Sequence, residues 1–344
     1  MLLRLSLGLG LFFGSLALGW GLHRRGLMPE ARASRVVRFL VRGPGPVILC
    51  LLFWGMNLRR VEPWLLPLLG ALIACSTLLP ARLFATWTTL SDSQTGSFLT
   101  CAMFSNLGYL GAFSAFALFG ETAYGFCMLY LLFFTPCFYT LGFWIGSRYG
   151  GAAQPVGLGA AFTPYHGSPA CEGGEEVVRN PKGASPKPRL SSRGTGFTGE
   201  LRLYPFAGML VGLLLNLTGI PRPLPLEWLN ALLIPLDTAL ILTAIGSQLT
   251  LESPLPWLRP CLAMSGIKFL YTPLVAWMFL NLFDLQGLSR TVVLLQASMP
   301  VGISPVMLAL LFGLDRRLAN ALWVWTTLLA IPWLLVLIPL LPKL

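Results

Sequence analysis

Two stretches of the sequence combine polar side chains and helix breakers within apolar surroundings. One runs from Asn106 to Gly111 and the other from Gln296 to Pro305. Proline removes a backbone donor and disturbs the preceding turn, and in an apolar medium every freed amide or carbonyl needs a partner. Such groups can bind a polar solute. The candidate binding residues are Asn106, Gly108, Tyr109, Gln296, Ser298, Pro300 and Ser304, and the candidate helix breaks are Gly111, Pro300 and Pro305. The alternative is a pair of kinked helices that pack tightly without a ligand.

Two ionisable residues, Asp237 and Lys268, also lie within apolar stretches. A charge at the centre of a bilayer costs about 2.5–3.5 kcal/mol on insertion scales, so each residue needs a partner or a watery cavity. In a functional interpretation, Lys268 attracts the carboxylate of a bound solute, while Asp237 balances its charge or carries a proton. In a structural interpretation, the two residues form an ion pair, or Lys268 extends to the membrane surface.

Sequence motifs of enzymes are missing. The chain has two histidines, and it contains no Walker motif, no Gly-rich dinucleotide fingerprint and no His-Glu-x-x-His motif. Its carboxylates are scattered, so paired acid–base catalysis has no obvious site. The sequence therefore predicts no enzyme, no metal site and no cofactor.

The elements that carry the candidate residues are predicted to be transmembrane helices. Of 344 residues, 55% are hydrophobic and 11% are charged, whereas soluble domains carry about 25% charge. A helix crosses the bilayer with about 20 apolar residues. We predict an all-α polytopic membrane protein with ten spans, at residues 5–21, 44–58, 64–84, 97–119, 124–146, 204–221, 229–250, 258–282, 291–313 and 319–341. Spans four and nine contain the two breaks.

Residues 147–203 separate the spans into two sets of five. This segment is rich in Gly, Pro, Ser and charge, which is typical of a flexible linker. An odd number of spans per half gives the halves opposite orientations, so we predict inverted repeats. The expected domains are a first five-helix repeat (1–146), the linker (147–203) and a second five-helix repeat (204–344). Gly10-x-x-x-Gly14 and Gly208-x-x-x-Gly212 predict close helix packing.

Basic residues are distributed unequally between the loops of the two sides. One side holds 17 Lys and Arg residues, including those from Arg24 to Arg42, and the other holds 6. Since cytoplasmic loops are enriched in Lys and Arg, both termini are expected outside and the linker 147–203 in the cytoplasm. Topology then explains the net charge of +11 without a nucleic acid partner. We expect an integral protein of the plasma (inner) membrane.

The order of motifs along the chain carries a family resemblance. The motifs are Asn106-Leu-Gly108-Tyr-Leu-Gly111, Ala117-Leu-Phe-Gly-Glu121, Leu129-Tyr130, Pro221-x-Pro223, Pro235 through Gly246-Ser-Gln-Leu249, and Met299-Pro300 with Ala309. In this order they resemble the auxin efflux carrier family of PIN-like membrane transport proteins, within the bile acid/auxin carrier superfamily. The chain departs from the family pattern at Phe113, where the family has Pro, and at Ser304, where it often has Asn.

The resemblance implies ten spans with crossed broken helices and the export of small organic anions by an elevator-like motion. We therefore expect a secondary active transporter, an efflux carrier of auxin-like or carboxylate compounds, with alternating access to a mid-membrane site. A sodium-coupled organic anion symporter of the bile acid carrier type and a non-transporting receptor or assembly protein are the alternatives. The expected partners are the organic anion and the lipid bilayer, and a homodimer is left open.

Overall fold

The computed structural model describes residues 2–58, 62–150, 196–248 and 253–341. Most of the predicted linker, residues 151–195, therefore lies outside the described residues. Within the described ranges the regular secondary structure is helical, apart from one isolated β-bridge.

The described helices of the first half are α1 (Leu2–Arg24), α2 (Glu30–Arg42), α3 (Pro44–Gly55), α4 (Leu66–Ser76), α5 (Leu78–Trp87), α6 (Asp92–Met103), the π-helical turn η2 (Leu107–Gly111), α7 (Ala112–Phe119), α8 (Glu121–Tyr130), α9 (Phe134–Cys137) and α10 (Phe143–Tyr149). Those of the second half are α11 (Gly196–Leu217), α12 (Leu224–Gly246), α13 (Leu258–Gly266), α14 (Thr272–Leu282), α15 (Gly287–Ala297), α16 (Ser304–Phe312) and α17 (Arg316–Leu337).

Seven helical stretches of the described residues are long and apolar enough to cross a membrane. They are Ser6–Arg24, Glu30–Gly55, Glu62–Trp87, Glu121–Tyr149, Leu224–Gly246, Leu255–Leu282 and Arg316–Leu337. Leu107–Phe119 and Tyr204–Leu217 are shorter apolar helices. The protein is therefore a polytopic, all-helical membrane protein. Predicted spans 97–119 and 291–313 are not continuous helices, since each is divided into two.

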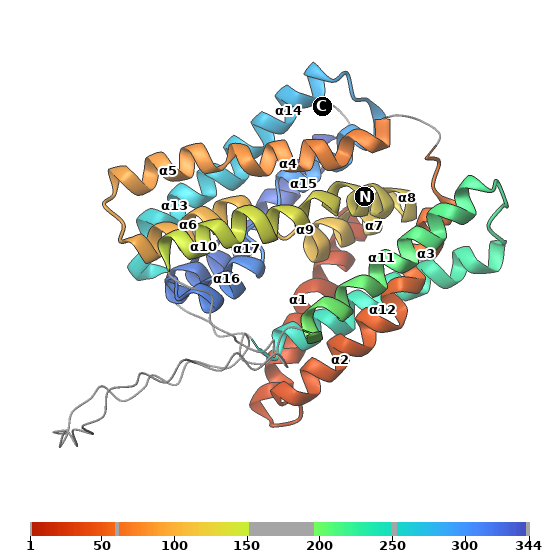
Figure 1. Ribbon diagram of the computed structural model, residues 1–344, viewed down its shortest axis with the longest axis horizontal. Helices are drawn as coiled ribbons and strands as arrows, with labels where there is room; N and C mark the ends of the chain where they lie inside the picture. The colour runs from red at the N-terminus through yellow and green to blue at the C-terminus, as the bar shows by residue number, and fades with distance from the viewer. Residues whose placement is uncertain (1, 59–61, 151–195, 249–252, 342–344) are drawn as a thin grey trace, which may run out of the picture.

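The helices form two groups that lie side by side (Figure 1). The small bundle consists of α1, α2, α3, α11 and α12, in which α3 packs along α11 and α1 packs along α12. The large bundle consists of α4–α6, α9, α10 and α13–α17. Helices α7 and α8 contact both bundles. Each bundle thus contains helices from both halves of the chain.

Glycines allow the helices of the small bundle to touch through their backbones. A Cβ atom on Gly208 or Gly212 of α11 would overlap the carbonyl oxygens of Pro46 or Cys50 in α3. This agrees with the close packing predicted for that pair. The prediction was wrong for Gly10 and Gly14, which have no atom within 4 Å of such a Cβ. Helix α1 instead approaches α12 at Gly19.

The arginine-rich segment after the first span is a helix and not the loop that the sequence predicted. Arg32, Arg35, Arg38 and Arg42 lie on α2, which joins α3 through Gly43. Pro44 lacks a backbone donor and suits the first turn of a helix, so it begins α3 after an irregular joint. The 26 residues Glu30–Gly55 exceed the length that a bilayer core requires, about 20 residues.

Candidate functional site

The first helix break lies between α6 and η2. Helix α6 begins with a capping box made by Ser91 and Gln94 and ends at Met103, before Phe104, whose backbone is extended. The side chain of Asn106 then accepts a hydrogen bond from the backbone N–H of Leu110 at 3.2 Å and caps η2. No proline is needed here, because an amide side chain that satisfies an N-terminal donor favours a new helix start.

The second helix break lies between α15 and α16, over Ser298–Ile303. Pro300 cannot donate a backbone hydrogen bond, which favours an interruption at this position. Pro305 lies in the first turn of α16, where the missing donor costs nothing. The prediction that Pro305 breaks a helix was therefore wrong, because Pro305 lies where a helix starts.

The two breaks cross and bond to each other. The backbone N–H of Asn106 donates to the carbonyl of Pro300 at 2.7 Å, and that of Gly302 donates to the carbonyl of Phe104 at 3.0 Å. Ser105 and Val301 form an antiparallel β-bridge. A Cβ on Gly302 would lie 2.8 Å from the Ser105 carbonyl oxygen, so this approach requires glycine. Each break thus satisfies backbone groups that the other leaves free.

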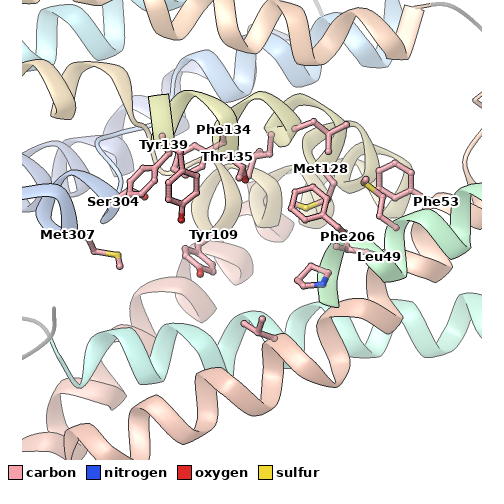
Figure 2. A pocket seen from close by; sticks show the side chains of 16 residues that line it. Leu49, Phe53, Tyr109, Met128, Phe134, Thr135, Tyr139, Phe206, Ser304 and Met307 are labelled. Atoms are coloured by element: carbon pink, nitrogen blue, oxygen red, sulfur yellow. The ribbon is translucent and has the colours of Figure 1, made fainter. Parts of the chain in front are cut away.

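A cavity of about 430 Å³ lies beside the crossing. Five of the predicted residues line it: Asn106, Gly108, Tyr109, Ser304 and Asp237. It shares eight lining residues with a second cavity of about 520 Å³, and together they lie between the two bundles. Figure 2 shows the side chains of Tyr109, Phe134, Tyr139 and Met307 around this second space.

Asp237 contributes the one ionisable carboxyl group among the described residues that line the first cavity. Its Oδ1 atom is buried and has no hydrogen-bond partner. No lysine or arginine lines either cavity within the described part of the chain. The cavity therefore places an unpartnered carboxyl oxygen near the starts of two short helices, η2 and α16.

Lys268 lies outside the cavity and is fully buried in the large bundle. Its ammonium donates to the carbonyl of Ala102 at 2.6 Å and to Ser105 Oγ at 2.7 Å. These groups lie at the C-terminal end of α6, where a cation is favourable. No ion pair joins Lys268 to Asp237 among the described residues, and Oδ1 of Asp237 has no hydrogen-bond partner. Asp237 and Lys268 therefore do not form the pair that the structural interpretation offered.

Three further predicted residues support the crossing from outside the cavity. Gln296 is fully buried and donates from Nε2 to the carbonyl of Leu107 at 3.3 Å, while its Oε1 has no partner. Ser298 donates to the Leu294 carbonyl at 2.8 Å. Pro300 contributes its backbone carbonyl. Gly111 leaves room for Gln296, because a Cβ there would overlap Oε1.

The apolar lining residues and a polar cluster at one end of α8 were not predicted from the sequence. Tyr124, Phe134 and Met307 line the first cavity, but no polar signal distinguished them from ordinary core residues. Glu121 bonds to Arg222 and Asn230 across the two bundles. The sequence could have indicated this pair, since Glu121 and Arg222 have opposite charges and lie in loops that are predicted to face the same side of the membrane.

Comparison with known proteins supports a transport assignment. Residues 197–338 match the family described as membrane transport protein. A search of curated proteins returns no match. The matched region contains α12, the second break and α17, and therefore includes one side of the crossing. Over residues 197–338 the chain is therefore similar to membrane transport proteins, and this similarity supports the resemblance to the auxin efflux carrier family.

Proposed function

We propose that the protein is a secondary carrier that moves small organic anions across the plasma membrane by alternating access. The observation that carries this proposal is the meeting of two helix starts, η2 and α16, at the cavity beside the crossing. The start of a helix carries partial positive charge and free N–H groups, which suit an anion. Asn106 and Ser304 add polar groups at the same two helix starts.

The cavity lining favours an anion with an apolar body. Around the polar groups lie Leu49, Met128, Phe134 and Met307, and the adjoining cavity adds Phe53, Phe138 and Phe206. Burial of apolar surface contributes about 25 cal/mol per Å². An aromatic or branched monocarboxylate gains from this lining, whereas a compact dicarboxylate would expose its second charge to it.

Asp237 gives the proposed carrier a way to couple the anion to a proton. An ionised carboxylate in the cavity repels a second negative charge, so anion binding favours protonation of Asp237. Proton and anion would then move together. Sodium coupling has less support at the crossing, because Lys268 already bonds to the Ala102 carbonyl and the Ser105 hydroxyl. These oxygens are the kind that a bound cation would use.

The helix arrangement is consistent with ten crossings in two inverted repeats, 1–146 and 204–344. Seven continuous stretches, the shorter α11 and the two divided segments together make ten. The packing is symmetric between the halves, since α3 of the second span packs on α11 of the sixth and α1 of the first span packs on α12 of the seventh. The break after α6 likewise pairs with the corresponding break after α15. Sliding of the large bundle along the small one would carry the crossing across the membrane. The basic end of the molecule, at α2, would face the cytoplasm.

Uptake into proteoliposomes tests the proposal. Purified protein is assayed with radiolabelled mono- and dicarboxylates, an aromatic acid included, with and without gradients of Na⁺ and of pH. We expect saturable uptake of an aromatic or branched monocarboxylate, dependent on pH and independent of Na⁺. Uptake that requires Na⁺ would support the symporter alternative. Ligand binding by monodisperse protein without uptake of any acid would support a receptor.

A further inference from the structure

From the crossing, the two cavities continue toward the end of α2 and the start of α11. They run from Asn106 and Gly302 along Tyr139, Pro205 and Phe206. In the opposite direction the path meets Ile48, Phe113 and Ile234, which are at most 5% exposed and pack on each other. These three residues are called the apolar layer below.

Helices α12 and α8 show the same order of residues from the cavity to the far end. On α12, Asp237 lines the cavity, Ile234 is in the apolar layer, and Asn230 belongs to a polar cluster. Asn230 lies seven residues from Asp237, which is about 10 Å along a helix. On α8 the order is Met128, Tyr124 and Glu121, where Tyr124 packs against the apolar layer.

On α3, Ile48 of the apolar layer also lines the first cavity, and the carbonyl of Leu51, three residues further along the helix, accepts from Arg222 in the polar cluster. The three helices therefore close the path in two successive steps, first with apolar side chains and then with polar ones.

The polar cluster joins α8 to the small bundle through charged hydrogen bonds. Arg222 donates to Glu121 from both terminal nitrogens, at 2.5 and 3.0 Å, and also to the Leu51 carbonyl at 2.8 Å. Asn230 donates to Glu121 Oε1 at 2.5 Å. Bidentate Arg–carboxylate pairs are among the strong and geometrically specific hydrogen bonds.

The polar cluster is largely shielded from solvent, but some of its polar atoms have no hydrogen-bond partner. The side chains of Arg222 and Glu121 are 9% and 21% exposed, and Arg222 Nε and Asn230 Oδ1 are buried without a partner. An ion pair with unsatisfied neighbours adds little net stability, whereas it fixes one arrangement of the groups that it joins. A contact of this kind suits a junction that must hold in one state and separate in another.

We propose that Glu121 and Arg222, together with the apolar layer of Ile48, Phe113 and Ile234, form the gate that closes the substrate path at the α8 end. The proposal rests on the proposed function, because it takes the cavity to be the substrate site. The gate is closed in this structure, since the Glu121–Arg222 pair is formed. Release of substrate at the α8 end requires the Glu121–Arg222 pair to separate.

Thiol labelling from each side of the membrane tests the gate without a substrate. Thr238→Cys places a reporter thiol in the first cavity. The chain without this substitution is the control, because it measures how fast the native cysteines are labelled. The reagent is the membrane-impermeant trimethylammonium-ethyl methanethiosulfonate, applied to sealed vesicles of both orientations. In the otherwise unchanged protein, the reporter should react faster from the side where α11 begins than from the side where α8 begins.

Glu121→Gln and Ile234→Ala, each added to the reporter, should raise the labelling rate from the α8 side by about tenfold. Glu227→Gln is the matched control, since Glu227 lies at the same end, 3.6 Å from Arg222, and is half exposed; it should leave the rate unchanged. The two gate variants alter different parts of the gate, the polar cluster and the apolar layer. One variant that is monodisperse in detergent is therefore enough to test the proposal. Equal rates from the α8 side in reporter and gate variants would overturn the proposal. If the gate variants label faster from the α8 side but the protein takes up no anion, only the proposed function would be overturned.

Discussion

The ammonium of Lys268 lies 2.7 Å from the hydroxyl oxygen of Ser105, the residue that pairs with Val301 where the two breaks cross. Through this bond and its bond to the Ala102 carbonyl, Lys268 holds the broken end of α6 from behind the cavity. From these contacts we expect Lys268 to act on transport by positioning the crossing and not by touching the substrate.

Lys268→Met should therefore reduce stability and transport while leaving ligand binding largely intact. A buried acceptor that loses its donor costs about 1–3 kcal/mol, and the Ala102 carbonyl would be such an acceptor. The measurements are the thermal midpoint in detergent, uptake, and the shift of the midpoint by a transported acid. Ser105→Ala removes one of the two acceptors and should have a smaller effect on the midpoint. Loss of binding at an unchanged midpoint would instead indicate that Lys268 contacts the substrate.

The location of the breaks could be predicted from sequence, but the role of each residue could not. Asn106, Pro300 and the surrounding glycines are visible as exceptions within apolar segments. Lys268 is flanked by apolar residues in both directions along the sequence, so no pattern indicates which face of the helix it lies on. That depends on how the helix packs. The same reason explains why Gln296 was predicted to bind substrate although it lies behind the crossing.

Composition also misled the prediction for residues 30–42. Their arginines lowered the local hydropathy and suggested a loop, yet Ala33 and Leu40 provide a buried face that packs α2 within the small bundle. An amphipathic helix that continues a span is hard to distinguish from a polar loop by hydropathy alone. The Glu121–Arg222 pair was missed for a different reason, because its members are 101 residues apart.

Gly111→Ala and Gly108→Ala should differ in their effects although the two positions lie in the same turn. A Cβ at Gly111 would overlap Gln296 Oε1 and approach Met299 Cγ to 2.9 Å, whereas a Cβ at Gly108 would meet Leu131 Cδ2 at 3.5 Å. Overpacking of this kind costs about 1–3 kcal/mol. We expect a lower thermal midpoint for Gly111→Ala and an unchanged midpoint for Gly108→Ala. Equal midpoints would show that Gln296 moves aside without cost.

Asp237→Asn should remove the pH dependence of transport. In the wild-type protein, uptake of an acid that stays ionised over the tested range should slow as the pH rises, because fewer carboxyl groups then carry the accompanying proton. The amide cannot ionise, so its uptake should be independent of pH. Initial rates in proteoliposomes measure this, with Glu227→Gln as a control for loss of an acidic group outside the cavity. A wild-type pH slope in Asp237→Asn would assign the proton to another group.

Asn106→Asp and Asn106→Ala separate the capping role of this residue from its proposed contact with the anion. Aspartate keeps an oxygen to accept from the Leu110 N–H, and neither change removes the backbone bond to Pro300. Loss of a cap costs about 1 kcal/mol, so Asn106→Ala should lower the thermal midpoint, while Asn106→Asp should stay close to wild type. Transport should rank in the opposite order for the two variants, because a carboxylate at the start of η2 repels an anion that alanine tolerates. Uptake at the wild-type rate by Asn106→Asp would mean that no anion approaches this helix start.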